Sequence, residues 1–446
     1  MIQLQGKKVT VLGLGRSGIA ASELLLSRGA KVFGSDSGNP VIPKGLFDHE
    51  LGEHTNRIFD ADIIIVSPGI PSDSPVLREA RRRKIRILGE IELAYQCFSG
   101  KLIAVTGTNG KTTTCAIIKE MLSNGGFNAL LGGNISPGVP LSRVVLKSSK
   151  DAIIVAEVST FQLETIELFK PFVGILTNIS PDHLDRHKNL ATYVSLKRKL
   201  FINQQKDDFC ILNFDEQLTK ETEAEVNSNV YFFSAKQKME KGTFLSHGKV
   251  FYANGNSPEL LFTRDDVRLP GMHNLENVLA ASTASILSGC DYESLKQTVS
   301  RFSGVPHRLE FVRELNGISF VNNSMCTNPV AFKRSVETMT SPFVLICGGR
   351  NKNLQLEKIV TSILKAKFTV IIGESSLKLA AYLRENGYEQ FELAGAMEDA
   401  VEIAYKKASR GDTVLLSPGA SSFDMFRDFV DRGNCFKQSV KRLNND

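Results

Sequence analysis

The sequence predicts an α/β protein made of three segments, each built on a mainly parallel sheet. Short apolar runs that suit buried strands alternate with longer stretches of helical period, a pattern typical of βαβ units. A length of 446 residues corresponds to about three domains at roughly 150 residues each. The residues that suggest chemistry come just after the predicted strands, where ligands bind in open α/β sheets. We therefore expect domains at 1–96, 97–303 and 304–446.

The predicted strands follow one another in the same way in each segment, with helical stretches between them. They are expected to begin the runs 7–15, 31–36 and 61–69, then 101–107, 152–159 and 173–180, and finally 318–324, 343–349, 368–374 and 412–419, each of which passes from strand to loop.

Composition and charge exclude several classes of protein. With 42% hydrophobic and 23% charged residues, the chain is neither disordered nor fibrous. A formal charge of +6, from 54 basic and 48 acidic residues, is too mild for a nucleic-acid-binding surface. No apolar run approaches the roughly 18 residues of a membrane span, and the start of the chain does not resemble a secretion signal. Seven scattered cysteines without metal-site spacing favour reduced thiols, so we expect a cytoplasmic protein.

A glycine-rich turn follows the first predicted strand. The segment 13–18 (GLGRSG), which contains Gly15 and Ser17, opens a helix whose N–H groups can hold a pyrophosphate. Asp36, at the end of the next strand, has the position of an acid that binds ribose. The pattern predicts a nucleotide-type ligand, either NAD or a UDP-sugar; the alternative is a set of purely structural glycines.

The segment 107–113 (GTNGKTT) is the clearest short motif. A glycine-rich loop opens a helix there, Lys111 can reach the β- and γ-phosphates of ATP, and the Thr112 hydroxyl can bind Mg²⁺. It is not a standard Walker loop, because Val105 stands where the leading glycine would be. A structural turn would need neither the lysine nor the hydroxyl, so we predict ATP binding. The residues expected to hold the nucleotide are Gly107, Thr108, Asn109, Gly110, Lys111, Thr112 and Thr113.

Acidic and histidine residues follow the next two strands. Glu157 ends an apolar strand, so it either solubilises a loop or holds Mg²⁺ on the triphosphate. The phosphate loop in the same segment favours the metal role. The following loop contains Asp182, His183, Asp185 and His187. Histidine is an uncommon ligand of Mg²⁺, but this density of polar groups favours a site role for His183 and leaves the other three open.

Polar residues on two predicted helices allow both structural and functional roles. Spacing alone predicts that Lys197 and Lys199 are exposed helix lysines. Asn274 and Asn277 share a helix face, where they could cap the helix or present amides to a base or phosphate. The pair 307–308 (HR) supplies a cation suited to a phosphate or ribose.

Six motifs in this order resemble those of the Mur ligases, and most closely of the members that add D-glutamate: GTNGKTT, AEVSTFQLE, TNISPDHLDRH, GMHNLENVLAA, PHRLE and LLSPGASSFDMF. The resemblance extends from GLGRSG to DRGNCF near the end of the chain. It implies a Rossmann-like N-terminal domain that binds the UDP substrate, a central P-loop-type ATPase domain and a Rossmann-like C-terminal domain that binds the amino acid. The implied activity is ATP-dependent addition of D-glutamate to UDP-N-acetylmuramoyl-L-alanine through an acyl phosphate, in peptidoglycan precursor synthesis.

The resemblance also implies residue roles, two Mg²⁺ ions and a monomer with no nucleic-acid or membrane partner. Catalytic residues would be Lys111, Glu157, His183 and Lys197. Metal ligands would be Thr112, Glu157, His183 and Lys197, with Lys197 carbamylated. ATP would also contact Asn274, His307 and Arg308. The UDP substrate and the amino acid would contact Gly15, Ser17, Asp36, Gly69, Asn134, Thr327, Lys352, Ser422, Phe423 and Phe429 (the last through its backbone).

The chain departs from the family pattern at three places. The usual Asn-Asp-Ser-Lys-Ala-Thr-Asn is here Asn-Asn-Ser-Met-Cys-Thr-Asn at 322–328, so an expected acid is Asn323 and an expected cation is Met325. Losing both roughly preserves the local charge. A compensated pair, a different amino acid or stereochemistry, and a weakened enzyme all fit this change. Gly38 stands where an arginine is often found, and the segment 417–422 lacks the usual cysteine.

Four hypotheses follow. The first is the D-glutamate ligase, and the second is the same chemistry with another amino acid such as L-glutamate. The third is an NAD-dependent oxidoreductase built on the segment 13–18, which would not need the phosphate loop or Glu157. The fourth is a non-catalytic nucleotide-binding homologue, against which the intact Lys111, His183 and Lys197 argue.

Overall fold

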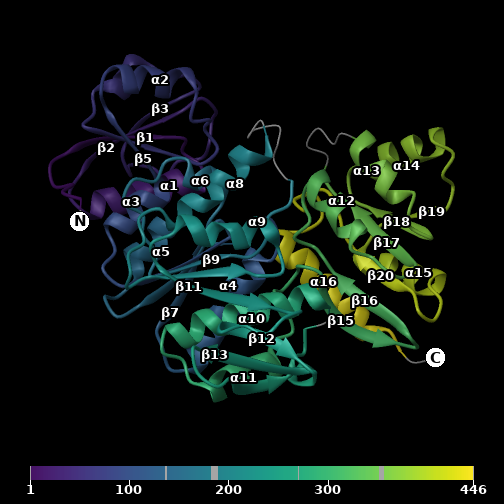
Figure 1. The fold of residues 1–446 in the computed structure, drawn as a ribbon. Coiled ribbons are helices and arrows are strands. Elements are labelled where there is room, and N and C mark those ends of the chain that lie inside the picture. The colour runs from purple at the N-terminus through teal and green to yellow at the C-terminus, as the bar shows by residue number, and fades with distance from the viewer. Residues whose placement is uncertain (1, 136–137, 182–188, 270, 351–355, 445–446) are drawn as a thin grey trace. The chain divides into compact units, whose positions relative to one another are not determined.

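The structure, a computed structural model, describes residues 2–135, 138–181, 189–269, 271–350 and 356–444. These residues form two compact units, divided in sequence between Phe302 and Ser303. Within the described residues, the first unit contains two sheets and the second contains one (Figure 1). The predicted limits of three domains, 1–96, 97–303 and 304–446, stay predictions.

The first sheet has five parallel strands in the order β3-β2-β1-β4-β5. Its elements are β1 (Lys8–Leu12), α1 (Arg16–Ser27), β2 (Lys31–Asp36), β3 (Asp48–Leu51), η1 (Asn56–Phe59), β4 (Ile63–Val66), α2 (Pro75–Arg82), β5 (Arg86–Gly89) and α3 (Glu90–Gln96). The strand order reverses between β1 and β4, which is the place where ligands bind in such folds.

The turn after β1 requires glycine. Gly13 has a φ of 81°, and a Cβ there would lie 2.9 Å from the Ser67 Cβ. A Cβ on Gly18 would lie 1.9 Å from the Gly13 carbonyl oxygen. These contacts bring the start of α1 close to the turn, so the glycines have a structural role whatever ligand binds there.

The second sheet has nine strands in the order β14-β13-β12-β11-β10-β9-β6-β8-β7. The strands are β6 (Lys101–Thr106), β7 (Ala129–Gly133), β8 (Ile153–Glu157), β9 (Val173–Leu176), β10 (Phe209–Asn213), β11 (Asn229–Ser234), β12 (Lys241–Ser246), β13 (Lys249–Asn254) and β14 (Glu259–Thr263). The run from β7 to β12 is parallel, whereas β12, β13 and β14 pair antiparallel.

Helices cover this sheet and bury its apolar strands. They are α4 (Lys111–Asn124), α5 (Leu141–Lys147), α6 (Thr160–Leu163), α8 (Leu190–Arg198), α9 (Gln217–Lys220), α10 (Met272–Leu287) and α11 (Tyr292–Arg301), with short turns η2 (Lys199–Phe201), η3 (Glu221–Glu225) and η4 (Arg264–Asp266). Ile103 of β6, Ile117 of α4 and Leu279 of α10 belong to one buried apolar cluster. This packing fixes α4 and α10 beside the end of β6.

Buried polar contacts link the two sheets of the first unit. Glu92 of α3 is fully buried, and its carboxylate accepts hydrogen bonds from the backbone N–H groups of 167–169 at 2.8 to 3.0 Å. Arg143 of α5 makes a two-pronged ion pair with Glu23 of α1. A buried carboxylate needs such donors, so Glu92 fixes one sheet against the other.

The second unit contains six strands in the order β15-β16-β20-β17-β18-β19. Its elements are β15 (Glu310–Leu315), β16 (Ile318–Asn322), α12 (Pro329–Glu337), β17 (Phe343–Gly348), α13 (Leu356–Ile363), β18 (Phe368–Ile372), α14 (Ser376–Glu385), β19 (Phe391–Ala394), α15 (Met397–Lys407), β20 (Thr413–Leu416) and α16 (Phe429–Arg442). All pairs are parallel except β15 with β16.

Alternate residues of the central strand β17 enter two separate cores. Leu345 packs with residues of α12, α13 and α14, whereas Val344 packs with residues of α15 and α16. Helices therefore cover both faces of this sheet, as expected of strands that are apolar on both sides. The predicted α/β class with mainly parallel sheets is confirmed.

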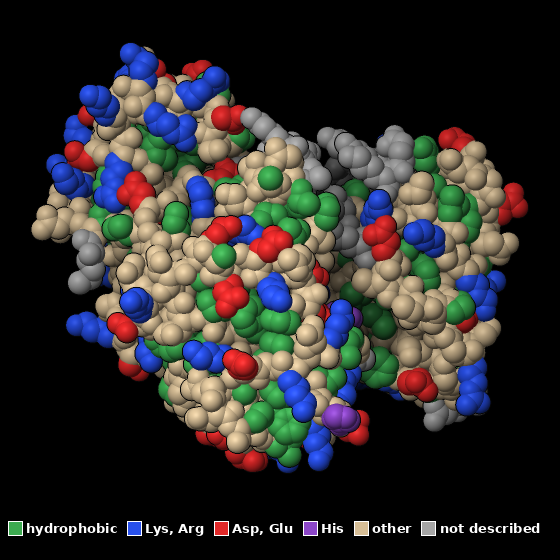
Figure 2. Space-filling view, in the orientation of Figure 1, with side chains coloured by type: hydrophobic (Ala, Val, Ile, Leu, Met, Phe, Trp, Pro, Cys, Tyr) green, Lys and Arg blue, Asp and Glu red, His purple; other side chains and the backbone are tan. Residues whose placement is uncertain are grey.

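Basic and acidic side chains are interspersed on the face seen in Figure 2, in keeping with the mild net charge of +6. Among the described helices, none is long and apolar enough to cross a membrane.

Candidate active site

The phosphate-loop motif forms the turn between β6 and α4. Gly110 immediately precedes α4 and has a left-handed φ of 81°. A Cβ on Gly110 would lie 2.2 Å from Asn277 Oδ1, and a Cβ on Gly107 would lie 1.9 Å from Thr177 Oγ1. Both positions therefore require glycine. The first turn of α4 supplies N–H groups without helical partners, which is how helix starts bind phosphates.

Side chains that follow β9 hold this loop. Thr177 Oγ1 donates to the Asn109 carbonyl at 2.7 Å, and Asn178 Oδ1 accepts from the Asn109 N–H at 2.9 Å. Lys111 Nζ donates to two carbonyl oxygens of the loop at 2.9 and 2.8 Å. The lysine thus lies along the loop, where a bound phosphate would compete with these carbonyls for its ammonium.

Glu157 joins the phosphate loop to the end of β7. It is the last residue of β8, which lies between β6 and β7 and is parallel to both. Its Oε2 accepts from the Thr112 hydroxyl at 2.5 Å, and its Oε1 accepts from Asn134 Nδ2 at 3.2 Å. Two predicted metal ligands and a predicted substrate residue therefore meet at one carboxylate.

This arrangement fits Mg²⁺. A carboxylate and a hydroxyl are hard oxygen donors, and Mg²⁺ usually adds waters and substrate phosphates to one or two such ligands. Glu157 is 4% exposed, and its two side-chain hydrogen bonds come from neutral groups. A cation would supply the charge that a buried carboxylate needs. Within the described residues, no cluster of three or more His, Cys, Asp or Glu side chains could hold a metal by itself.

The exposure predicted for Lys197 is wrong. Lys197 lies on α8 and is 2% exposed, with its Nζ 4.4 Å from the centre of the Tyr193 ring. Tyr193 is also buried, and its hydroxyl lies 3.1 Å from Thr108 Oγ1 of the phosphate loop. Helical spacing cannot reveal this burial, because it depends on what α8 packs against. Lys199, in η2, is partly exposed.

Five of the predicted residues, Asp182, His183, Asp185, His187 and Lys352, lie outside the described residues. Their predicted roles stay predictions.

Helix α10 brings two predicted asparagines to the phosphate loop. Asn277 Nδ2 lies 3.4 Å from Asn274 Oδ1, so the two side chains share a face as predicted. Asn277 Oδ1 also accepts from Thr114 Oγ1 at 3.3 Å. Gly271 is the cap residue of α10, and Asn277 lies beyond the first turn, so Asn277 does not cap the helix. The side chain of Asn277 therefore packs against the loop at Gly110.

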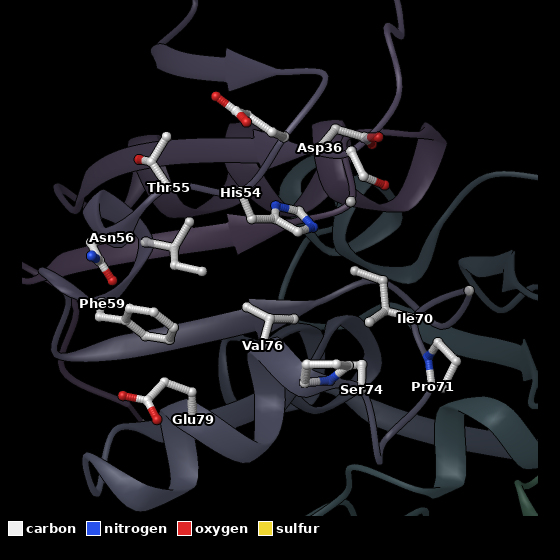
Figure 3. Close-up of a pocket in the computed structure, with 16 residues that line it drawn as sticks. Asp36, His54, Thr55, Asn56, Phe59, Ile70, Pro71, Ser74, Val76 and Glu79 are labelled. Atoms are coloured by element: carbon white, nitrogen blue, oxygen red, sulfur yellow. The ribbon is translucent and has the colours of Figure 1, made fainter.

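A cavity of about 970 Å³ lies beside the first sheet (Figure 3). Gly13 and Asp36 of the predicted nucleotide pattern line it, together with Gly69, a substrate contact implied by the family resemblance. Gly15 and Ser17 are not among its lining residues.

Asp36 organises the glycine-rich turn at the edge of this cavity. Its Oδ2 accepts from the Leu14 N–H at 2.6 Å, and its Oδ1 accepts from the Gly38 N–H at 2.8 Å. Ser67 Oγ donates to the Gly13 carbonyl at 2.7 Å. The acid thus has a structural role besides any contact with a ligand.

In the second unit, Asn323 and Met325, the two residues that differ from the family pattern, contact neutral groups. Asn323 Oδ1 accepts from the Leu309 N–H at 3.2 Å, and its Nδ2 lies 3.4 Å from Ser417 Oγ. A carboxylate could accept but not donate at the second position. Met325 is partly buried, and its backbone N–H donates to the His307 carbonyl at 3.0 Å. The amide therefore fits where the family carries an acid.

His307 is buried and has a defined proton arrangement. Its Nδ1 lies 3.0 Å from Asn322 Nδ2, while Asn322 Oδ1 accepts from the Ser324 N–H at 3.1 Å. The second contact fixes Nδ2 as the donor, so the ring nitrogen accepts. Burial, and next the charge of Lys437, lower the pKa of His307, which favours a neutral ring with its proton on Nε2. Arg308 beside it is exposed.

The predicted amino-acid contacts differ in exposure. Ser422 is 2% exposed, Phe423 is 55% exposed and Thr327 is exposed. Phe429 is the first residue of α16, and its carbonyl accepts from Ser324 Oγ at 2.7 Å. Its backbone N–H lies in the first turn, where a helix can bind a carboxylate.

Sequence reasoning missed Arg432 and Tyr193. Arg432 is fully buried and donates to Ser324 Oγ, to the Ser324 carbonyl and to the Ala420 carbonyl at 2.9 to 3.1 Å. Burial lowers its pKa to about 10. Arg432 lies in DRGNCF, the last stretch of the family resemblance. That match was the only sequence feature that could have drawn attention to it.

Three family models match successive parts of the chain. Residues 7–89 match a model described as Mur ligase MurD-like, N-terminal domain. Residues 105–285 match the Mur ligase middle domain, and residues 307–419 match the Mur ligase, glutamate ligase domain.

Relatives match over nearly the whole length. A UDP-N-acetylmuramoylalanine--D-glutamate ligase of Thermoanaerobacter sp. (strain X514) is 39% identical over 99% of this chain and 100% of its own. One from Pelotomaculum thermopropionicum is 42% identical over 98% of each chain. A UDP-N-acetylmuramate-alanine ligase structure from Thermotoga maritima has a TM-score of 0.56 at 18% identity, covering 98% of this chain and 99% of that one. This likeness shows the fold.

Three mainly parallel α/β sheets and a glycine-rich loop that opens a helix are typical of nucleotide-binding enzymes. The chain belongs to the Mur ligase family, and the protein is an enzyme of the ligase class. The oxidoreductase hypothesis is therefore wrong.

Proposed function

We propose that the protein is a cytoplasmic, monomeric, ATP- and Mg²⁺-dependent ligase that joins D-glutamate to UDP-N-acetylmuramoyl-L-alanine in peptidoglycan precursor synthesis. The observation that carries this proposal is the meeting of Thr112 and Asn134 at the buried carboxylate of Glu157. It puts a phosphate-loop hydroxyl and a predicted substrate amide on one acid. The substrate pair comes from the names of the relatives.

The first turn of α4 and the loop before it would hold the phosphates of ATP. Lys111 already lies against the loop, so its ammonium can follow the charge of the transferring phosphoryl group. Thr112 and Glu157 would hold Mg²⁺, which when bound neutralises the phosphate oxygens. A second ion would use His183 and a carbamylated Lys197, by resemblance to the family.

The reaction would proceed in two displacements. The substrate carboxylate attacks the γ-phosphorus of ATP, the bond to ADP breaks, and an acyl phosphate forms. The amine of the amino acid then attacks the acyl carbon and loses a proton, and phosphate leaves from the tetrahedral intermediate. Lys111 would stabilise charge in the first step, and Asn134 would position the substrate beside Glu157.

Two residues of this chain bear on which amino acid is added. Met325 replaces a cation expected near the amino acid, and Asn323 is held by neutral partners. A second candidate is therefore the same ligation with another amino acid, such as L-glutamate.

Phosphate release from ATP tests the proposal. The assay contains Mg²⁺ and UDP-N-acetylmuramoyl-L-alanine, with D-Glu, L-Glu, D-Asp, L-Lys or no amino acid. We expect stimulation by D-Glu alone. Stimulation by another amino acid alone would replace the substrate and keep the ligation. The absence of stimulated phosphate release with every amino acid tested would contradict the proposed function.

A further inference from the structure

The described lining of the cavity beside the first sheet consists of acids, neutral polar groups and apolar groups, without a lysine or arginine. The acids are Asp36, Glu53 and Glu79. Phosphates would be repelled there, whereas the N–H groups at the start of α1, beyond Gly13, can receive them. The body of the cavity therefore suits the neutral, donor-bearing part of a nucleotide.

Apolar side chains form the opposite wall of the cavity. Phe59, Ile70 and Val76 lie along it, across from the imidazole of His54 (Figure 3). The guanidinium of Arg83 lies 4.1 Å from the centre of the Phe59 ring. A planar base could lie against this apolar wall with its polar edge toward His54.

A chain of hydrogen bonds leads from a carboxylate to His54. Glu50 accepts from the Thr55 N–H at 2.9 Å, from Thr55 Oγ1 at 2.6 Å and from Ser35 Oγ at 2.8 Å. Burial raises the pKa of Glu50, but these hydrogen bonds outweigh it and hold the pKa below its ordinary value. Glu50 is therefore ionised and can only accept.

The carboxylate decides which nitrogen of His54 carries the proton. Ser35 has one hydroxyl proton, which it donates to Glu50 in a hydrogen bond. Ser35 Oγ also lies 2.7 Å from His54 Nδ1, so that contact requires a proton on Nδ1. In the neutral ring, Nε2 is then an acceptor. Among the described residues no hydrogen bond reaches Nε2, and His54 lines the cavity.

We propose that His54 reads the base of the nucleotide, with Nε2 accepting the N3–H of uracil, and that Ser35 and Glu50 are positioning residues that set its tautomer. The inference rests on the proposed function, which supplies a UDP-linked substrate. Uracil carries a hydrogen on N3 and cytosine does not, so the same acceptor would favour UDP over CDP. A site built to pair with one hydrogen rejects a ligand that lacks it.

Binding of free nucleotides to the full chain tests this without the ligase reaction. Calorimetry on the wild type should show UDP binding about tenfold tighter than CDP, and UMP about tenfold tighter than 3-methyluridine monophosphate. The methyl group replaces the N3 hydrogen and also adds bulk, so a loss of affinity is assigned to the hydrogen bond only where CDP shows it too and His54→Ala abolishes it. Equal affinities for UMP and its 3-methyl form would overturn the proposal.

Variants locate the effect on the protein. His54→Ala should lower UDP affinity about tenfold and bring the UDP to CDP ratio near one, and Ser35→Ala should lower the ratio in part. His49→Ala, a histidine on β3 outside the cavity lining, is the matched control and should keep the wild-type ratio. Thermal unfolding verifies that each variant is folded. A wild-type ratio in folded His54→Ala would refute the role of His54.

The outcomes separate this inference from the proposed function. If UDP binds with no dependence on N3–H or on His54, the inference fails while the ligase proposal stands. If the wild type binds neither UDP nor the UDP-linked substrate, both fail. If the base is read as inferred but the phosphate-release panel is silent, the inference stands and the proposed function fails.

Discussion

The two units carry their predicted site residues in different states. In the first unit, the phosphate-loop motif is present, and Thr112 and Asn134 each donate a hydrogen bond to Glu157. In the second unit, the segment after β16 has exchanged an acid and a cation for Asn323 and Met325, and the amide is bound to neutral groups. The first set is thus assembled around one buried carboxylate, whereas the second lacks the charged pair that the family resemblance led us to expect.

The largest effect should come from the phosphate loop. Lys111→Ala removes the ammonium that follows the transferring phosphoryl group, and we expect phosphate release to fall about a thousandfold. Lys119→Ala, on the same helix α4, is the control and should leave the rate near wild type. A wild-type rate in Lys111→Ala would show that the loop has been assigned wrongly.

A smaller but still large effect is expected at the shared carboxylate. Glu157→Gln keeps the size and one acceptor but removes the charge, so we expect the Mg²⁺ concentration for half-maximal activity to rise by about ten- to a hundredfold. A Mg²⁺ titration of phosphate release measures it. Glu223→Gln, an exposed residue of η3, serves as the control. An unchanged Mg²⁺ requirement would count against the metal role of Glu157.

We expect substitutions at Asn323 and Met325 in the second unit to have coupled effects. Asn323→Asp and Met325→Lys each add one uncompensated charge, so each alone should lower kcat/KM for the amino acid by about tenfold. The double variant restores the charge pair and should lie within about threefold of wild type. Additive losses would mean that the two positions act independently and that their joint change is not compensatory.

The smallest effect concerns stability. Burial lowers the pKa of His307 below 6.5 in the folded protein, so the unfolded chain binds the proton first as the pH falls. Stability should therefore fall with decreasing pH below about 6.5, until the folded-state pKa is passed. Urea unfolding of wild type and His307→Gln measures the difference, with His247→Gln as a control for an exposed histidine. A steeper loss in His307→Gln than in the wild type would contradict the direction of the shift.

The expected strands are all present because their apolar runs are continuous, but several other parallel strands, among them β7, β10 and β11, were not predicted. Residues 343–348 and 412–416 are buried on both faces, and such runs stand out without knowledge of the fold. The antiparallel strands β12, β13 and β14 were not predicted either, since they are short and show neither a continuous apolar run nor strict alternation. The phosphate loop was found because glycine, lysine and threonine at this spacing, between a strand and a helix, are typical of phosphate binding.

Long-range contacts explain what the sequence could not predict. The ring of Tyr193, one turn earlier on α8, covers Lys197, but its burial also requires the packing of α8 against other elements; Arg432 is buried among groups of Ser324 and Ala420. The proton position on His54, in the loop after β3, depends on Ser35 of β2 and Glu50 of β3. Such arrangements arise only when separate strands meet, so local spacing carries no record of them.

The most direct test of the proposed chemistry follows one oxygen atom. UDP-N-acetylmuramoyl-L-alanine labelled with ¹⁸O in its alanyl carboxylate is incubated with ATP, Mg²⁺, D-glutamate and the enzyme, and the released phosphate is analysed by mass spectrometry. If the carboxylate attacks the γ-phosphorus, one labelled oxygen appears in each phosphate. Unlabelled phosphate alongside amide product would contradict an acyl phosphate and the proposed role of the phosphate loop in phosphoryl transfer.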